Sequence, residues 1–227
     1  MQIQTPKRTL ITTEDGSHSI YVPELNEHYH STHGAIQESN HVFIEAGLKE
    51  ILKSKRSISI FEMGFGTGLN AFLTLIYSLE HDIDIQYTAI EAFPVEEELL
   101  NKLNYGEIIN EGAFENYFMN LHSAEWEQWN HLHENFQFIK HKVSLLDFKS
   151  DDKFDLVYFD AFAPNVQPEL WTTEIFQKIY NSMNSGGVLV TYCCKGEVKR
   201  SMKSAGFSIE KLPGPPGKRE ILRAKKA

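Results

Sequence analysis

The sequence predicts an α/β protein with a doubly wound, mostly parallel sheet, because apolar runs of strand length alternate with segments of helix length along most of its 227 residues. A glycine-rich turn after the first of these runs points the same way. A Pro-Gly loop near the C-terminus separates two more short runs, which predict a final antiparallel pair. The expected strands are 57–63, 84–91, 135–142, 154–160, 186–193, 206–212 and 218–223, and the expected helices are 68–80, 94–103, 168–183 and 195–205.

The first 50 residues are expected to form an extension packed on the main domain, which would occupy 51–227. Two β-prone runs, 9–12 and 18–22, flank an Asp-Gly turn and predict a small hairpin. A helix is expected over 36–53. The aromatic-rich segment 105–133 is predicted to be a helical insertion, with Trp126 and Trp129 at helical spacing for packing.

The composition is that of an ordinary globular protein, with 41% hydrophobic and 23% charged residues. No apolar run approaches the roughly 20 residues that span a bilayer, so no membrane role is expected. Residues 1–8 lack the apolar core of a secretory signal. The only cysteines, Cys193 and Cys194, are adjacent, which argues against a stapling disulfide and favours the reducing cytoplasm.

Charge is distributed unevenly along the chain. The net charge is −9, yet residues 187–227 hold ten Lys/Arg and three Asp/Glu and carry +7, which leaves −16 for the rest. A solvated basic face would explain this difference. A local patch that binds RNA phosphates would explain it equally well.

The segment from Glu62 to Asn70 predicts a nucleotide-shaped pocket, because glycines at 64, 66 and 68 let the backbone turn tightly beside a ligand at a helix N-terminus. A carboxylate two residues before the first glycine would sit badly beside the pyrophosphate of a dinucleotide. S-adenosylmethionine (SAM) has no phosphate and carries a sulfonium and an amino group. The pattern therefore favours SAM over NAD.

Acidic residues at two further strand ends fit the same pocket. Glu91 ends the strand after the glycine turn, where an acid commonly accepts hydrogen bonds from ribose hydroxyls. Asp147 follows the next strand and would reach the adenine edge, or serve instead as a helix cap or loop acid.

Asp160 opens a loop with the sequence Asp-Ala-Phe-Ala-Pro after a predicted strand that is apolar except for Asp155. An acid, an aromatic residue and a proline in this order resemble the loop of amino-group methyltransferases. An amine that attacks a sulfonium methyl needs its lone pair aimed in line, and a carboxylate can hold its N–H groups. A structural acid at the strand end is the alternative.

The histidine-rich segment 28–33, with His41 nearby, fits no common zinc spacing and has no thiolate, so no metal is expected.

Together, segments 29–44, 61–70, 91–94, 160–171 and 217–222 resemble the MnmC/MnmD family of tRNA methyltransferases. The resemblance implies a class I SAM-dependent methyltransferase with a Rossmann-like sheet. It also implies methyl transfer from SAM to the exocyclic amine of 5-aminomethyl-2-thiouridine at the wobble position of tRNA. Because this chain ends at Ala227, the resemblance further implies a standalone methyltransferase without FAD, which depends on separate enzymes to supply the aminomethyl form.

The resemblance assigns roles to particular residues of this chain. Asp160 would orient the amine and lie beside the cofactor. The other cofactor-binding residues would be Glu62, Gly64, Phe65, Gly66, Thr67, Gly68, Asn70, Glu91 and Asp147. On the substrate side, Tyr29, Glu38, Phe162 and Pro164 would line the pocket, while tRNA phosphates would meet Lys195, Lys199, Arg200, Lys218 and Arg219.

Other functions remain compatible with the same motifs. A SAM-dependent enzyme for another amine would share the glycine turn and the Asp160 loop. An NAD-dependent oxidoreductase would share the architecture, although Glu62 and the Asp160 loop oppose it. A non-catalytic nucleotide-binding protein would bind SAM without forming product.

Overall fold

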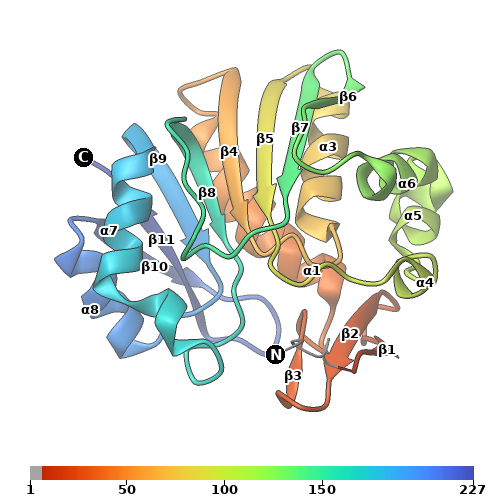
Figure 1. Cartoon of the computed structure of the whole chain (residues 1–227), viewed down its shortest axis with the longest axis horizontal. Coiled ribbons are helices and arrows are strands. Elements are labelled where there is room, and N and C mark those ends of the chain that lie inside the picture. Colours follow the sequence, from red (N-terminus) through yellow and green to blue (C-terminus); the bar gives the residue numbers. More distant parts are fainter. Residues whose placement is uncertain (1–6) are drawn as a thin grey trace.

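The computed structural model describes residues 7–227, so the first six residues of the predicted extension lie outside the described part. Its centre is an eight-stranded sheet with the strand order β10-β11-β9-β8-β4-β5-β7-β6 (Figure 1). Five neighbouring strands are parallel: β9 (Met183–Thr191), β8 (Phe154–Phe159), β4 (Ser57–Met63), β5 (Asp84–Ile90) and β7 (Phe136–His141). The antiparallel strands are β11 (Glu220–Lys225) and β10 (Ser208–Pro213) at one edge and β6 (Asn130–His133) at the other. The predicted fold class is confirmed.

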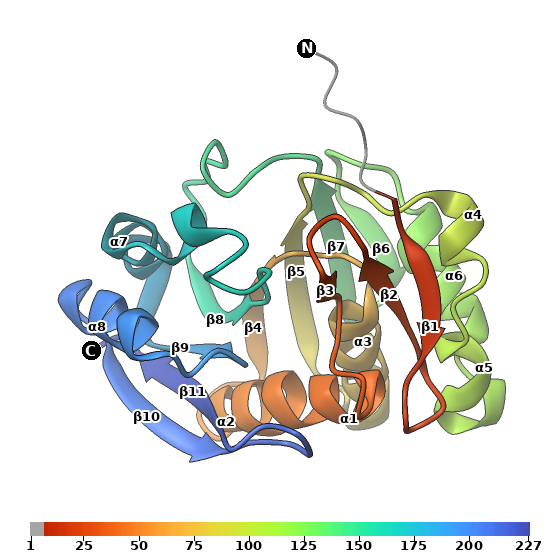
Figure 2. The ribbon, with the colours of Figure 1, turned by 90° about the horizontal axis from the view of Figure 1, so that it is seen from below.

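Alternating side chains of the central strands build two apolar layers. In β4, Ile58 and Ile60 join the layer on one face, while Phe61 and Met63 join the layer on the other. The first layer is covered by the helix formed by α1 (Ala35–Ser39), η1 (Asn40–Leu48) and α2 (Lys49–Ile51), and by α3 (Leu69–His81). The second is covered by α7 (Thr173–Ser182) and α8 (Gly196–Ser204) (Figure 2). Because both faces of the sheet are covered, apolar residues predominate on both faces of the central strands.

The segment 105–133 is only partly helical, which corrects the predicted helical insertion. It forms α5 (Tyr105–Ile108), η2 (Ile109–Gly112) and α6 (Glu115–Ser123), and then β6. Trp126 and Trp129 lie in the turn between α6 and β6. The turn is closed by the side-chain amide of Asn130, which donates to the carbonyls of Glu125 at 3.0 Å and Gln128 at 2.8 Å.

Two predicted helices differ from the observed ones. The helix expected over 94–103 is the single turn α4 (Glu97–Leu100). The helix expected over 168–183 begins with the 3₁₀ turn η3 (Pro168–Trp171), and α7 starts afresh because Thr172 caps it, its side chain accepting from the Ile175 amide at 3.3 Å.

The N-terminal hairpin is confirmed, and it belongs to a three-stranded sheet of β1 (Thr9–Thr12), β2 (His18–Val22) and β3 (Glu27–His28). Figure 1 shows this sheet beside the carboxyl ends of the parallel strands. The Tyr105 hydroxyl donates to the His18 carbonyl at 2.6 Å, and the His18 amide donates to the Asn104 side chain at 2.8 Å. These bonds hold the small sheet against the insertion.

The strand order reverses between β4 and β8. From β4 the chain continues to β5 on one side, and from β8 it continues to β9 on the other. The loops that leave β4 and β8 therefore diverge and open a crevice at their carboxyl ends, which is where ligands bind in open α/β sheets. The Asp160 amide donates to the Met63 carbonyl at 3.0 Å, and this bond holds the starts of the two loops together.

Among residues 7–227, no helix is long and apolar enough to cross a membrane.

Candidate active site

A cavity of about 830 Å³ lies at this reversal point. Its size falls in the range of small-molecule sites. Its walls come from the turn after β4, the end of β5, the segment 143–145, the loop after β8 and the N-terminal sheet. The residues that line it include Arg8, Tyr29, Glu38, Gly64, Phe65, Gly66, Thr67, Asn70, Glu91, Asp160, Phe162, Tyr192 and Lys218.

The glycine turn is shaped by its close contacts. Gly64 has φ +92°, and a Cβ atom there would lie 2.5 Å from the Asp160 carbonyl oxygen. Gly66 has φ +50°, and a Cβ atom there would lie 3.1 Å from the Tyr29 ring. Larger residues would therefore collide with the β8 loop or with the N-terminal segment. The glycines keep a backbone cradle open, as SAM or another nucleoside ligand requires.

Glu91 holds the turn from the end of β5. Its carboxylate accepts from the Gly66 amide and from the Phe93 amide, each at 2.9 Å. The side chain also lines the cavity, so its remaining lone pairs are available to ribose hydroxyls.

Glu62 lies beneath the cavity floor with 0% exposure, so the predicted direct contact between Glu62 and the cofactor is not supported by its placement. Burial, reinforced by the charge of Asp160, raises the pKa of Glu62 well above its usual range. Asn70, the second residue of α3, does face the cavity. Its Oδ1 atom is buried without a partner among the described residues and could accept from an amino group.

Asp160 occupies the centre of the crevice. Its Oδ2 atom accepts from Asn70 Nδ2 at 2.9 Å. Burial raises the pKa of Asp160 to about 7, with the negative charge of Glu38 adding to the rise and Lys218 opposing it. A carboxylate with this pKa can accept and return a proton near neutral pH.

Another wall of the cavity combines aromatic and charged groups. The Tyr29 and Phe162 rings meet edge to face at 5.2 Å. Lys218 Nζ donates to a Glu38 carboxylate oxygen and lies 4.0 Å from the centre of the Tyr192 ring. The Tyr192 hydroxyl donates to the Ala161 carbonyl at 2.8 Å. The wall is thus fixed from α1, β9 and the β10–β11 loop.

Comparison with known proteins adds the decisive observation. Residues 109–227, slightly more than half of the chain, match a family model described as S-adenosyl-L-methionine-dependent methyltransferase. The chain belongs to this family. The methyltransferase assignment excludes the NAD-dependent oxidoreductase considered above, and SAM is the cofactor that the family uses.

Relatives of the methyltransferase agree with the predicted resemblance. One relative is the tRNA 5-methylaminomethyl-2-thiouridine biosynthesis bifunctional protein MnmC of Burkholderia thailandensis. It is 29% identical over an alignment of 227 positions, which covers 94% of this chain and 34% of the relative. The MnmC protein of Campylobacter hominis is 28% identical over 217 residues, covering 90% of this chain and 31% of that protein. The chain spans about a third of the length of these curated relatives.

Solved structures show the same fold. MnmC2 from Aquifex aeolicus superposes with a TM-score of 0.75 at 24% identity, covering 98% of this chain and 72% of that chain. Spermidine synthase from Thermotoga maritima superposes with a TM-score of 0.55 at 11% identity, covering 99% of this chain and 70% of that one.

Several predicted site residues of the methyltransferase lie away from the cavity. Asp147 lines a separate, smaller pocket with Glu127 and His141, and Ser144 and Leu145 line the main cavity in its place. This displacement arises because the chain turns after Leu145, with the Asp147 amide bonded to the Ser144 carbonyl at 3.0 Å.

Two residues of the predicted loops support the cavity without lining it. Gly68 has φ +73° and precedes the first turn of α3. Pro164 lies between the lining residues Ala163 and Val166.

The predicted phosphate contacts divide into two groups. Lys195, Lys199, Arg200 and Arg219 lie outside the cavity, and all except the half-buried Lys199 are exposed. Lys195 Nζ donates to the Asn165 side chain at 3.0 Å, at the outer side of the loop after β8. Lys218 instead lines the cavity in contact with Glu38, so its placement does not support a phosphate contact.

Sequence reasoning missed Arg8 and Tyr192. Arg8 donates to the Pro94 carbonyl at 2.9 Å and to Glu96 at 3.1 Å, and lies 5.9 Å from the centre of the Tyr29 ring. No pattern marks this arginine, because its partners are more than 80 residues away in the sequence. Tyr192 directly follows β9, and its place at the carboxyl end of a predicted strand could have indicated it.

Within residues 7–227, no group of three or more His, Cys, Asp or Glu side chains is arranged to hold a metal ion.

Proposed function

We propose that this methyltransferase methylates the exocyclic amine of 5-aminomethyl-2-thiouridine at the wobble position of tRNA. The observation that carries the proposal is the partly buried Asp160 carboxylate, which Asn70 holds beside the glycine turn. The names of the MnmC relatives supply the tRNA and the modified uridine.

The residues of the glycine turn fit SAM. The cradle formed by Gly64 and Gly66 would take the methionine part, the Glu91 carboxylate would accept from the ribose, and the free Asn70 Oδ1 would accept from the amino group. SAM supplies an electrophilic methyl group on a sulfonium that leaves as a neutral thioether.

Asp160 prepares the acceptor. An alkylamine is largely protonated at neutral pH and must lose a proton before its lone pair can attack. The Asp160 carboxylate, with its pKa raised to about 7 by burial, takes this proton and then holds the N–H groups so that the lone pair is aimed at the methyl carbon. Attack forms the N–CH₃ bond and breaks the S–CH₃ bond, the product leaves as a secondary ammonium, and Asp160 releases the proton that it took to solvent.

Exposed basic residues near the cavity would contact the RNA backbone in the cytoplasm. Lys195 lies against the loop after β8, and Arg200 and Arg219 are exposed residues of the same basic segment, 187–227. Phosphate contacts of this kind position RNA and are weakened by salt.

The test uses labelled SAM and tRNA from cells that lack the enzyme, followed by nucleoside analysis. A new 5-methylaminomethyl-2-thiouridine supports the proposal. Methylation of a different amine would show that the proposed substrate is wrong. SAM binding without product on any tRNA would indicate a non-catalytic protein.

A further inference from the structure

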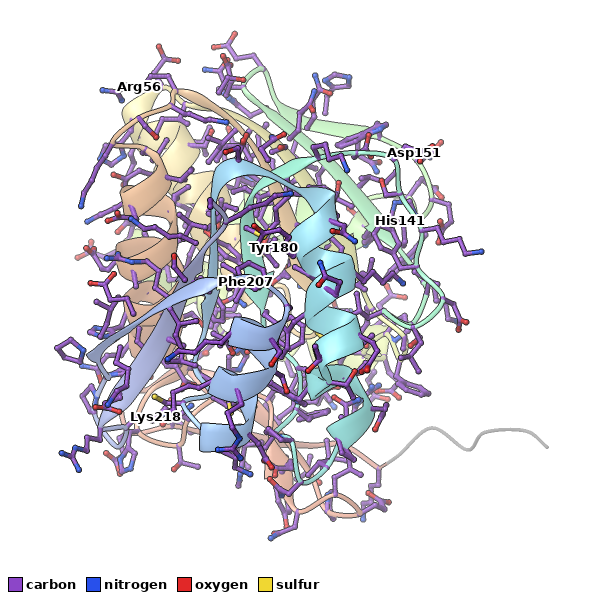
Figure 3. All side chains as sticks on the ribbon, turned by 90° about the vertical axis from the view of Figure 1, so that its left-hand side faces the viewer. Arg56, His141, Asp151, Tyr180, Phe207 and Lys218 are labelled. Carbon is purple, nitrogen blue, oxygen red and sulfur yellow. The ribbon has the colours of Figure 1, made fainter. Side chains whose placement is uncertain are left out.

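Glu38 and Lys218 form an ion pair inside the cavity. Figure 3 shows Lys218 at the opposite end of the molecule from Arg56, the residue that precedes β4. The Lys218 side chain is 29% exposed and the Glu38 side chain is 9% exposed. Removing two charges from water costs free energy unless further hydrogen bonds compensate. An ion pair kept at a cavity wall is therefore a candidate for contact with a ligand.

Neighbouring groups fix both members of the pair. The Ser31 amide donates to Glu38 Oε2 at 2.7 Å, and the Tyr192 ring lies 4.0 Å from Lys218 Nζ. The loop of Lys218 is also tightly packed, because a Cβ atom at Gly217 would lie 2.0 Å from His33. The pair is therefore preorganised.

Both members keep unused hydrogen-bonding capacity. Lys218 has three N–H donors, and Glu38 is its hydrogen-bond partner among the described residues. The two oxygens of Glu38 can accept about four bonds in all, and two are in use. The cavity wall thus presents an acceptor beside a donor.

A uracil-type base carries the complementary pattern. Its N3–H donor lies next to the O4 acceptor, and O4 lies next to C5, which bears the aminomethyl group. Cytosine has the reverse order at the same positions, with an acceptor at N3 and a donor at N4. Enzymes that act on a base commonly extrude it and read this edge by hydrogen bonds, with aromatic side chains against its faces.

We propose that Glu38 accepts from N3–H and Lys218 donates to O4 of the extruded base, so that the pair selects uracil over cytosine and directs the C5 substituent toward Asp160. The inference rests on the proposed function and deepens it. The Tyr29–Phe162 pair supplies aromatic surface in the same cavity. The charges of Glu38 and Lys218 both act on Asp160, as expected if the three groups adjoin one substrate.

The experiment uses the full chain, labelled SAM and two anticodon stem-loop RNAs that differ only in the wobble base, 5-aminomethyluridine or 5-aminomethylcytidine. The quantity compared is the ratio of kcat/KM for the two RNAs. We expect the unaltered protein to prefer the uridine RNA by roughly 10- to 100-fold, the effect of one well-placed pair of hydrogen bonds. Lys218→Met and Glu38→Gln should bring the ratio close to one, whereas Lys218→Arg, which keeps a donor, should preserve most of the preference.

Lys195→Met is the matched control, because an exposed phosphate contact should slow both RNAs equally and leave the ratio unchanged. Calorimetry with SAM shows whether each variant is folded. An equal slowing of both RNAs in folded Lys218→Met and Glu38→Gln would assign the pair a structural role and overturn the inference. Equal methylation of both RNAs by the unaltered protein would also overturn it, whereas methylation of neither RNA would count against the proposed function itself.

Discussion

The Asn70 side-chain amide donates to the Asp160 carboxylate with 2.9 Å between Nδ2 and Oδ2. Asn70 belongs to the first turn of α3, which follows the glycine turn, and Asp160 follows β8. One hydrogen bond therefore joins the cofactor side of the cavity to the acceptor side. Because the bond restricts the carboxylate, it fixes the direction from which an amine can approach.

Asp160→Ala is expected to lower methyl transfer by at least about 100-fold while SAM still binds, since the variant loses the group that deprotonates and aims the amine. Single-turnover assays and calorimetry with SAM measure the two effects. Asp155→Asn is the control at the other end of β8, where Asp155 accepts from the Ser59 amide at 3.1 Å and pairs with Lys55. It should reduce stability and spare transfer, and full activity in Asp160→Ala would remove Asp160 from the mechanism.

The stability of the protein should also depend on Asp160 in a defined pH range. Burial raises the folded pKa to about 7 from the ordinary 3.8, so the folded state holds this proton more tightly than the unfolded state. The resulting stabilisation is complete below pH 3.8 and is lost as the pH rises through 7. Asp160→Asn should therefore melt at a higher temperature than the unaltered protein at pH 8, and the difference should shrink toward pH 4. If Asp160→Asn instead melted at a lower temperature than the unaltered protein at pH 8, the pKa of Asp160 would not be raised in the folded state.

Gly64→Ala should impair both folding and SAM binding. The added Cβ atom would lie 2.5 Å from the Asp160 carbonyl oxygen, at a backbone φ of +92°. Gly186→Ala shares the unfavourable conformation, with φ +76°, but its Cβ atom would meet nothing within 4 Å. Thermal melting should show a loss of about 1 kcal/mol from backbone strain in Gly186→Ala and a larger loss in Gly64→Ala. Equal losses would mean that the contact with Asp160 is unimportant.

Arg8→Met should weaken RNA methylation without abolishing it. Arg8 ties the N-terminal sheet to the segment 93–96, and its loss removes the hydrogen bonds to the partly buried Pro94 carbonyl and the exposed Phe93 carbonyl, at a cost of about 1 kcal/mol. The Tyr29 ring beside it would then move more freely, and KM for RNA should rise more than kcat falls. Lys102→Met breaks the exposed pair with Glu98 and should change neither stability nor KM measurably. If the two variants behave alike, the N-terminal sheet does not shape the site.

Glu91→Ala should weaken SAM binding much more than Asp147→Ala. Glu91 lines the main cavity and holds the Gly66 amide, whereas Asp147 lines the separate pocket. Isothermal titration of both variants with SAM gives the comparison. A larger loss in Asp147→Ala would restore the adenine role that the sequence suggested for that residue.

The central sheet could be predicted from sequence because most residues of the parallel strands are buried, on both faces of the sheet. In β8 all six residues are buried, and all except Asp155 are apolar or aromatic. The glycine turn and the acids Glu91 and Asp160 were located for a related reason, since each directly follows such a strand.

Other elements depend on contacts that a local pattern does not record. The strand β6 contains two histidines and an asparagine and forms only by pairing with β7. Lys218 is indistinguishable in sequence from the basic residues around it, and only the packing of its loop against α1 turns it into the cavity.

The Glu38–Lys218 contact joins residues 180 positions apart in the chain. Contacts of such large sequence separation form late, because a long loop must close before they can be made. During synthesis the glycine turn and the Asp160 loop emerge well before Lys218. A nascent chain can therefore assemble the methyl-donor side of the cavity while its acceptor wall is still incomplete, and it gains base selectivity only when its last strands have joined the sheet.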